Sequence, residues 1–306
     1  MKTYYGLNKV KKFKNAVVAL GVFDGVHIGH RHILRKCAAK ARRINGTSVV
    51  VTFYPHPQGQ PSLYSLKHRL RLIDEMGIDV CVVINFSRHF ARISALDFIK
   101  NILVDKIGSR FIFVGKNFRF GRQAAGDLKL LENLSSSYGY KVISFGVIKK
   151  NNQPVSSTYI RALITKGKLD EAEKLLQRPV TVYGTVICGI SLARRIGFPT
   201  ANINPHHEIM PPPGVYAVKI IFNQRIYQGV CNIGKSSETI HQQKDKYVEV
   251  HIFNFNRNIY GKDLEIIFIQ KIRQEMDFSH HSDFLGYAAG QIKKDIAAAK
   301  NIFSRH

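Results

Sequence analysis

Five short runs of apolar or β-branched residues in the first half of the chain alternate with stretches of helical periodicity. The runs cover residues 17–20, 47–53, 80–84, 111–114 and 141–146, and the helical stretches between them cover residues 31–43, 66–76, 94–103 and 128–136. Strands that are separated by helices pair in parallel through right-handed crossovers. The pattern therefore predicts an open α/β sheet of the Rossmann-like kind, in which ligands bind at the carboxyl ends of the strands.

The pattern changes at Pro179, directly after a helical stretch over residues 169–176. Alternating runs at 180–187, 214–222, 225–230, 247–253 and 264–272 predict antiparallel strands joined by short polar loops, and one helical stretch follows over 282–302. A chain of 306 residues accommodates two domains. We expect an open parallel-sheet domain over residues 1–178 and an antiparallel β-barrel with one closing helix over residues 179–306.

Composition narrows the class of protein. Hydrophobic residues make up 45% of the chain, which excludes wholesale disorder, and no apolar run approaches the roughly 20 residues that span a bilayer. The N-terminal segment has no long apolar stretch before a small-residue cleavage site, so we expect no signal peptide. The four cysteines, Cys37, Cys81, Cys188 and Cys231, lack the paired spacing of metal ligands and predict a reduced cytoplasmic protein with buried thiols.

The net charge of +25 is concentrated in the first half. Residues 1–178 carry 31 basic and 11 acidic side chains, whereas residues 179–306 carry 15 and 10. Such a field attracts polyanions, whether nucleotides, RNA or an acidic membrane surface. No nucleic-acid-binding motif accompanies it, and the favoured interpretation is charge spread over a solvated face. We therefore expect neither a dedicated nucleic-acid partner nor a membrane partner.

The turn after the first long apolar run carries the most specific motif, Phe-Asp-Gly-Val-His-Ile-Gly-His over residues 23–30. A helix is expected to start there, and backbone N–H groups at a helix N-terminus favour an anion. His27 and His30 add two donors that can stabilise charge on a reacting phosphate. Gly29 is expected to let the backbone approach a ligand closely. The motif predicts a nucleoside triphosphate and an attack at phosphorus.

Two further segments of the first half have alternative interpretations. Residues 115–122 combine glycines, cations and phenylalanines after a strand, so they could bind phosphate and a ring, or close the edge of the core. The hydroxyls of residues 156–158 are helix caps first and phosphate ligands second, and Arg161 lies one turn further on. The first of these segments, together with the 23–30 turn and residues 52–57, would converge at the carboxyl edge of the sheet.

The second half offers neutral and acidic oxygen donors. Thr200 and Asn202 lie two residues apart, so they point the same way from an extended chain and suit a Mg²⁺ ion that carries phosphate oxygens. The alternative is a proline-stiffened turn with a hydroxyl cap. Glu249 alternates with apolar neighbours and either faces solvent or acts as a base toward a hydroxyl group. The sequence alone favours solvent.

Taken together, these motifs closely resemble the bifunctional prokaryotic riboflavin kinase/FAD synthetase family over nearly the whole chain. The matching segments, in order, are residues 23–30, 52–53 with 55–57, 115 with 117–121, 156–158 with 160–161, 197–202, 213–216, 232–234, 249–251 and 260–262. The resemblance implies an N-terminal nucleotidyltransferase domain that joins FMN to the AMP part of ATP and releases pyrophosphate. It also implies a C-terminal flavokinase barrel that phosphorylates riboflavin to FMN.

The resemblance assigns roles in the adenylyl transfer, which such families perform by direct in-line attack of the FMN phosphate on the α-phosphorus. Catalysis then consists of positioning and charge neutralisation. His27 and His30 would be catalytic and hold the ATP phosphates. The other implied ATP-binding residues are Phe23, Asp24, Gly25, Gly29, Asn117, Ser157, Thr158 and Arg161. The implied flavin-binding residues of this half are Phe53, Pro55, His56 and Phe118.

In the kinase half, Gly197, Thr200 and Asn202 would hold Mg²⁺-ATP, with Thr200 and Asn202 as the metal ligands. Glu249 would take the proton from the ribityl 5′-hydroxyl. Asn232 and Arg273 would contact the flavin. The implied metal is therefore Mg²⁺, and the small-molecule partners are ATP, riboflavin, FMN and FAD. A cytoplasmic location is expected, and weak self-association is left open.

The chain departs from the family pattern at several positions. Tyr54 replaces a usual acidic residue, and Tyr159 replaces a usual arginine. Residues 235–239 read Lys-Ser-Ser-Glu-Thr where a residue pair and Pro-Thr are usual, and Ala193 stands where a second glycine is common. The last two departures lie in expected kinase loops. One alternative is therefore an FAD synthetase with an impaired kinase module, and a lower-ranked one is an RNA- or polyanion-binding protein on a nucleotidyltransferase scaffold.

Overall fold

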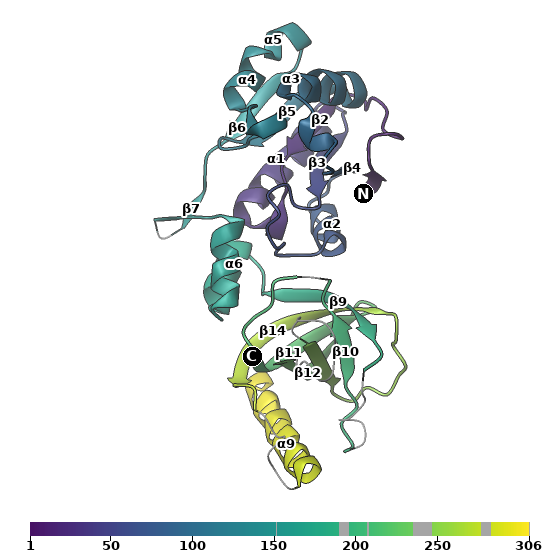
Figure 1. Cartoon of the computed structure of the whole chain (residues 1–306), viewed down its shortest axis with the longest axis vertical. Helices are drawn as coiled ribbons and strands as arrows, with labels where there is room; N and C mark the ends of the chain where they lie inside the picture. The colour runs from purple at the N-terminus through teal and green to yellow at the C-terminus, as the bar shows by residue number, and fades with distance from the viewer. Residues whose placement is uncertain (151, 190–195, 207, 235–246, 277–282, 306) are drawn as a thin grey trace. The chain divides into compact units, whose positions relative to one another are not determined.

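The computed structural model covers residues 1–306 (Figure 1) and describes all of them except 151, 190–195, 207, 235–246, 277–282 and 306. By its internal contacts the chain divides into two compact units, Met1–Tyr159 and Ile160–His306. The expected domain boundary after Arg178 falls later than this division. Residues 160–178, between the observed division and the expected boundary, belong to the second unit. They contain most of α6 (Ser157–Thr165) and all of α7 (Leu169–Leu176).

The first unit is an open sheet of six strands in the order β1-β4-β3-β2-β5-β6, and all neighbouring strands are parallel. The strands are β1 (Lys2–Tyr5), β2 (Ala16–Leu20), β3 (Ser48–Tyr54), β4 (Val80–Asn85), β5 (Ser109–Gly115) and β6 (Lys141–Phe145). The predicted open α/β fold is confirmed. Strand β1 was not expected, because its four residues at the sheet edge carry no buried apolar run.

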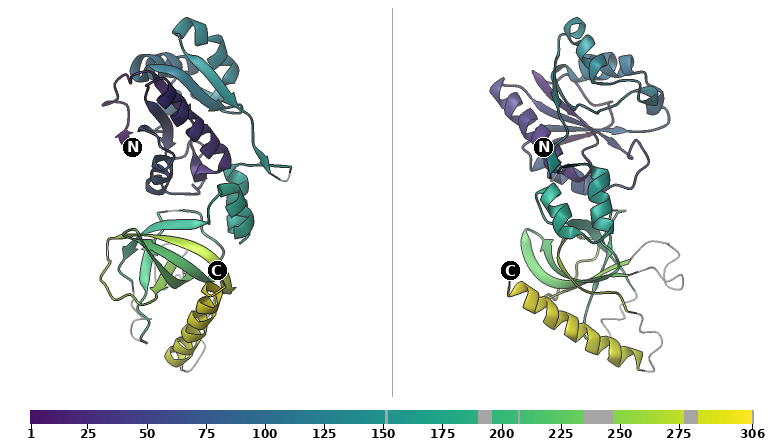
Figure 2. Two further views of the ribbon diagram at one scale, coloured as in Figure 1. Left: turned by 180° about the vertical axis from the view of Figure 1, so that it is seen from behind. Right: turned by 90° about the vertical axis from the view of Figure 1, so that its left-hand side faces the viewer.

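Helices cover both faces of this sheet (Figure 2). They are α1 (Ile28–Arg43), α2 (Leu66–Asp74), α3 (Ala95–Asp97) continuing as a π-helix over Phe98–Ile107, α4 (Leu128–Asn133) and α5 (Ser135–Tyr138). Helix α1 packs on β2 and β3, and Cys37 of α1 donates its thiol hydrogen to the Val17 carbonyl. On the other face, Phe98 and Leu103 of the π-helix pack in one core with Val18 of β2. The strands are therefore buried from both sides, which explains their continuous apolar runs.

The strand order fixes where a ligand can bind. The chain runs outward from β2 through β3 to β4 and then returns to place β5 on the other side of β2. In open α/β sheets ligands usually bind where the strand order reverses, which here is at the carboxyl ends of β2 and β5. The 23–30 turn follows β2, and the segment from Gly115 follows β5, so both motifs lie at these strand ends. A small hairpin, β7 (Lys149–Lys150) and β8 (Gln153–Pro154), comes after the sheet.

The second unit contains a closed antiparallel barrel in the order β10-β13-β12-β11-β14-β9. The strands are β9 (Thr181–Ile187), β10 (Ala201–Asn204), β11 (Gly214–Phe222), β12 (Arg225–Gly234), β13 (Tyr247–Ile252) and β14 (Asp263–Arg273). Helix α9 (Phe284–Phe303) packs against the outside of β11 and β12, where Ala299 joins a core with Val215 and Val230. The predicted barrel with one closing helix is confirmed. Only the short strand β10 was not expected, because it lies in a segment that also suits a proline-stiffened turn.

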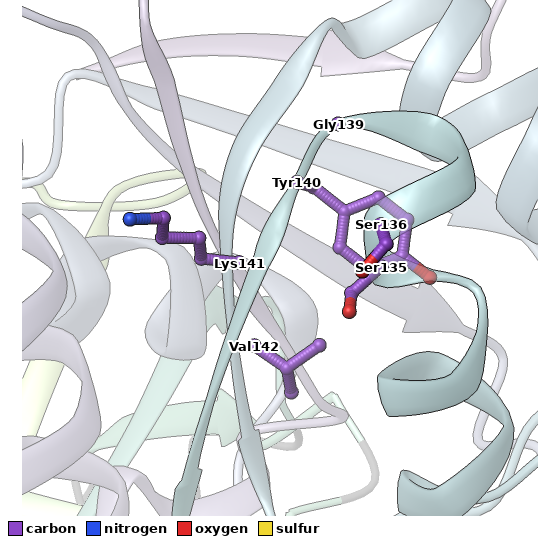
Figure 3. Close-up of a pocket in the computed structure, with 6 residues that line it drawn as sticks. All are labelled: Ser135, Ser136, Gly139, Tyr140, Lys141 and Val142. Atoms are coloured by element: carbon purple, nitrogen blue, oxygen red, sulfur yellow. The ribbon is translucent and has the colours of Figure 1, made fainter.

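A hollow of about 530 Å³ lies at the start of β6, on the edge of the sheet opposite the carboxyl ends (Figure 3). It is lined by Ser135, Ser136, Gly139, Tyr140, Lys141 and Val142. Figure 3 shows that the Lys141 side chain points away from the two serines, so its charge does not face them. None of the residues that line the hollow is among the predicted site residues. Within the described residues, no helix is both long enough and apolar enough to cross a membrane.

Candidate active sites

The first site is built around the turn between β2 and α1. His27 caps α1, because its Nδ1 accepts a hydrogen bond from the His30 backbone N–H at 3.4 Å. The two imidazole rings stack with centroids 3.6 Å apart and an interplanar angle of 18°. Phe23 packs edge-on against His30 at 5.3 Å. The structure therefore brings the two predicted catalytic histidines together at the N-terminus of α1, directly after the carboxyl end of β2.

Gly29 makes room for the neighbouring histidine. A Cβ atom at this position would lie 3.2 Å from Cε1 and 3.3 Å from Nδ1 of His27, closer than a well-packed side chain allows. A side chain at this position would therefore press on the imidazole and shift it by a few tenths of an ångström. The expected role, close approach of the backbone to a ligand, stays a prediction.

The backbone of this turn adopts costly conformations. Phe23 has φ +55°, Gly25 has φ +78° and Val26 has φ +38°, and both non-glycine residues are buried. Positive φ values at bulky residues cost free energy and persist only where surrounding contacts impose them. Such strain is typical of functional turns, where it holds a side chain in position.

One of the contacts that impose this conformation comes from Asp24. Its buried carboxylate accepts hydrogen bonds from the Leu63 N–H at 2.9 and 3.0 Å and from the Tyr64 N–H at 3.4 Å. Its backbone carbonyl accepts a hydrogen bond from Ser157 Oγ at 2.8 Å. Asp24 and Ser157, two predicted ATP-binding residues, therefore also connect the turn to segments far apart in the sequence.

Arg69 is a site residue that sequence reasoning missed. Its Nη1 donates to the Val22 carbonyl and its Nη2 to the Phe53 carbonyl, each at 3.0 Å, and Thr52 Oγ1 donates to the same Val22 carbonyl at 2.8 Å. The side chain is almost completely buried. Burial lowers the pKa of the guanidinium, whereas the nearby Asp24 carboxylate raises it. Arg69 thus joins the carboxyl ends of β2 and β3, from which both predicted binding segments emerge.

A sequence signal for Arg69 does exist. The residue lies on the apolar stripe of α2, between the start of the helix and the buried pair Leu72 and Ile73. A charged residue on such a stripe is buried only when its donors find partners. The partners themselves come from two strands, so the α2 sequence cannot identify them.

Residues 115–122, which begin at the last residue of β5, were expected either to bind phosphate and a ring or to close the edge of the core. Phe120 is buried and packs against Phe98 at 5.4 Å, while Phe118 is partly buried and stacks on Phe120 at 5.9 Å. These phenylalanines close the edge of the core, as the structural interpretation predicted. Asn117 is exposed at the carboxyl edge of the sheet, and Arg119 forms an ion pair with Asp127 at 3.0 Å. Binding of flavin by Phe118 and of phosphate by Asn117 stays a prediction.

The segment at residues 156–158 does form a helix start. Ser156 Oγ accepts a hydrogen bond from the Tyr159 N–H at 3.2 Å, which confirms the capping interpretation for this residue. Thr158 follows in the first turn of α6, and Arg161 belongs by its contacts to the second unit. In the 52–57 segment, Phe53 is buried at the end of β3. Pro55 and His56 follow it, and His56 Nδ1 accepts from the Gln58 N–H at 3.2 Å.

The second site is a row of polar side chains across three adjacent strands. Asn202 of β10 lies directly opposite Glu249 of β13, which lies directly opposite Asn232 of β12. Residues that oppose each other in antiparallel strands share a face, with Cβ atoms about 5 Å apart. Within β13 the alternate residues Val248 and Val250 are buried, whereas Glu249 is only partly so. Glu249 therefore lies between two amides on the outer face of the barrel, where it is partly exposed, and its role as a base stays a prediction.

The segment that precedes β10 is attached to the same face. His251 Nδ1 donates to the Pro199 carbonyl at 2.9 Å, and its ring contacts Phe198 edge-on at 5.9 Å. Thr200, partly exposed, follows directly, and Gly197 precedes it with φ +87°. A Cβ atom at Gly189 would overlap the Asn202 amide, so that glycine makes room for the side chain. Thr200, Asn202 and Glu249 thus belong to one region of the barrel, and the roles implied for them stay predictions.

Arg273 is engaged with the closing helix. Its Nε and Nη2 donate to the two carboxylate oxygens of Asp295 at 2.8 and 2.7 Å, and Gln291 Nε2 donates to the same carboxylate at 3.0 Å. Asp295 is buried, and the Arg273 side chain is 19% exposed. The contacts that the structure shows for this guanidinium therefore fix α9 to β14, and contact with a flavin stays a prediction.

The oxygen donors of the second site suit Mg²⁺. Thr200 and Asn202 supply neutral oxygens, which suit a hard cation that already carries phosphate oxygens. In the described ranges, no group of three or more His, Cys, Asp or Glu side chains could hold a metal ion. A magnesium ion here would therefore depend on hydroxyl and amide oxygens and on phosphate.

The cysteines are all free thiols. Three are buried, as predicted, and burial raises the pKa of Cys37 and Cys81 to about 12. For Cys188 the prediction is wrong, because it is exposed just after β9. The two departures in the kinase loops, at Ala193 and at residues 235–239, lie outside the described residues.

Comparison with known proteins matches each half of the chain to a different family. Residues 9–159 match the family described as FAD synthetase, and residues 176–303 match the family described as riboflavin kinase. The bifunctional riboflavin kinase/FMN adenylyltransferase of Buchnera aphidicola subsp. Schizaphis graminum is 37% identical, over 99% of each chain. The protein of the same name from Escherichia coli K12 is 32% identical, over 99% of this chain and 98% of its own.

A solved structure shares the fold of the whole chain. It is the crystal structure of a protein from Streptococcus pneumoniae described as a macrolide-efflux protein, with a TM-score of 0.82 and 27% identity. The likeness covers 98% of this chain and 99% of that one. The combination of an open parallel sheet and a closed barrel is therefore found together in another chain of similar extent.

Proposed function

The chain belongs to the family of bifunctional riboflavin kinases/FMN adenylyltransferases, and we propose that it catalyses both reactions, one in each unit. The barrel phosphorylates riboflavin with ATP, and the parallel-sheet unit joins the product FMN to AMP from a second ATP. The observation that carries this proposal is the presence of two separate polar sites: the stacked histidines after β2 and the Asn202–Glu249–Asn232 row on the barrel.

In the first unit, a phosphate oxygen of FMN attacks the α-phosphorus of ATP, and pyrophosphate leaves. His27 and His30 bind the ATP phosphates at the N-terminus of α1, where backbone N–H groups and imidazole donors stabilise charge that develops on the oxygens. Because no covalent enzyme intermediate is involved, the rate depends on how rigidly these donors are held. The Asp24 and Arg69 contacts support this role by fixing the turn before the histidines.

In the barrel, Glu249 accepts the proton of the ribityl 5′-hydroxyl as the oxygen attacks the γ-phosphorus of ATP, and ADP leaves. A carboxylate is suited to this role when it lies within hydrogen-bond reach of the hydroxyl. The flanking amides of Asn202 and Asn232 support the assignment, because they offer polar contacts on either side of the base.

Magnesium is the metal that these residues fit. Thr200 and Asn202 would hold it together with the ATP phosphates, and Mg²⁺ neutralises phosphate charge when it is bound. The charge excess of the first half is proposed to serve ATP capture or solubility rather than a nucleic-acid partner. The cytoplasmic location, which rests on four unpaired cysteines, and weak self-association stay predictions.

The proposal is tested by chromatography of flavins after the full chain is incubated with riboflavin, ATP and Mg²⁺. We expect FMN to appear first and FAD to follow. His30→Ala should abolish FAD formation and leave riboflavin phosphorylation intact, and Glu249→Gln should do the reverse with FMN still converted to FAD. If the unaltered chain leaves riboflavin untouched but converts added FMN to FAD, the kinase half of the proposal is wrong and the impaired-kinase alternative holds.

A further inference from the structure

Tyr247 connects the polar row of the barrel to a second carboxylate. Its Oη donates to Glu275 Oε1 at 3.1 Å and accepts from Asn232 Nδ2 at 3.4 Å. The ring lies over the end of β12, where Tyr247 opposes Gly234, and a Cβ atom at Gly234 would overlap the ring. The space for this tyrosine is therefore provided by a glycine two residues from Asn232.

The proton of the tyrosine hydroxyl decides how the Asn232 amide is oriented. A phenol has one proton to donate, and the carboxylate of Glu275 can only accept. Burial, and then the negative charge of Glu275, raises the pKa of Tyr247, so the phenol keeps its proton. Because the phenol donates this proton to Glu275, its oxygen presents only a lone pair to Asn232. The amide must therefore present Nδ2 to Tyr247 and turn Oδ1 away.

The consequence is an acceptor without a donor. Asn232 Oδ1 is buried and has no hydrogen-bond partner among the described residues. Leaving a buried acceptor unsatisfied costs about 1–3 kcal/mol, unless a ligand supplies the donor. Asn232 lies directly across from Glu249. A substrate whose hydroxyl gives its proton to Glu249 would therefore lie next to Asn232 Oδ1.

We propose that Tyr247 and Glu275 are positioning residues for the kinase reaction, which orient the Asn232 amide so that its Oδ1 accepts a hydrogen bond from a hydroxyl of the polyol substrate beside Glu249. The inference rests on the proposed kinase function of the barrel. It adds two residues that touch neither substrate nor nucleotide and that act only through the direction of one amide.

The test is Tyr247→Phe in the full chain, which removes the hydroxyl and keeps the ring over Gly234. Without the hydroxyl the amide is free to turn its oxygen away from the substrate. We expect the KM for riboflavin to rise about five- to tenfold, which corresponds to one hydrogen bond. The KM for ATP and the rate of FAD formation from added FMN should stay unchanged. Tyr227→Phe, which removes a hydroxyl elsewhere on β12, is the matched control and should change neither constant.

A double-mutant cycle separates orientation from mere packing. Glu275→Ala should raise the riboflavin KM as Tyr247→Phe does, and combining the two should add little, because both act on the same amide. Glu275→Gln, whose carbonyl still accepts the phenol proton, should restore most of the affinity. A riboflavin KM unchanged in Tyr247→Phe, or additive effects in the double variant, overturns the inference while the kinase function stands. Absence of FMN formation by the unaltered chain overturns both.

Discussion

Replacement of Arg69 by methionine should destabilise the first unit more than any exposed arginine does. The change removes two charge-assisted hydrogen bonds, to the carbonyls of Val22 and Phe53, each contributing about 1.5–3 kcal/mol. It also removes a positive charge near the buried Asp24 carboxylate. Removing one member of such a buried set typically costs about 3–5 kcal/mol. Because Thr52 still donates to the Val22 carbonyl, we expect a loss near the lower end of that range.

Hydrogen exchange measured by mass spectrometry reports this loss locally, which matters because a two-unit chain need not unfold in one step. A loss of about 3 kcal/mol corresponds to exchange that is faster by about two orders of magnitude. The accelerated peptides should cover residues 16–30 and 48–56, and peptides from the barrel, such as residues 214–234, should be unchanged. FAD formation should fall, and riboflavin phosphorylation should persist.

Two variants sharpen the experiment. Arg69→Lys keeps a charge that can reach one carbonyl at a time, so it should lie between the unaltered chain and Arg69→Met. Arg35→Met, on the exposed side of α1, removes a comparable surface cation and should cost little. The reasoning is refuted if Arg69→Met exchanges at the rates of Arg35→Met and retains full FAD formation.

Three further predictions concern other parts of the chain. Gly25→Ala should lower the free energy of unfolding by about 1–3 kcal/mol, measured by thermal unfolding, and should lower FAD formation. The reason is that φ at this position is +78° and the new Cβ would lie 2.5 Å from a buried leucine. Gly146→Ala, where a Cβ meets nothing within 4 Å, serves as the control. Asp295→Asn should destabilise the barrel by about 3 kcal/mol, because it leaves the charge of Arg273 uncompensated where α9 packs. Denaturant unfolding measures this loss, and a variant as stable as the unaltered chain would contradict the role of Asp295 in holding α9. Cys188 should react with a thiol reagent at pH 8 in the folded chain, since burial raises the pKa of the three other cysteines and shields them; labelling of four thiols at one rate would argue against the fold.

The prediction from sequence succeeded where the signal is local. Strand β11 was predicted with its observed bounds, and helix α7 likewise, because a change of hydrophobic period and a chain break are visible within one segment. The stacked pair His27 and His30 was also accessible, since both residues belong to one turn. Strand β10 was missed because four residues are too few to establish a period, and its pairing with β9 and β13 supplies what the segment lacks.

The sequence by itself determined the two units, the parallel sheet, the barrel and the order of the motifs, because periodicity and glycine or proline positions act within a few residues of one another. Tertiary structure alone decided which side chains meet. Strand register places Glu249 between two amides. Arg69 donates to carbonyls at the ends of two separate strands, and Arg273 pairs with Asp295 on a helix distant in sequence. The physical reason is that a buried polar group must find a partner, and the partner is set by how elements cross and pair rather than by the sequence around either residue.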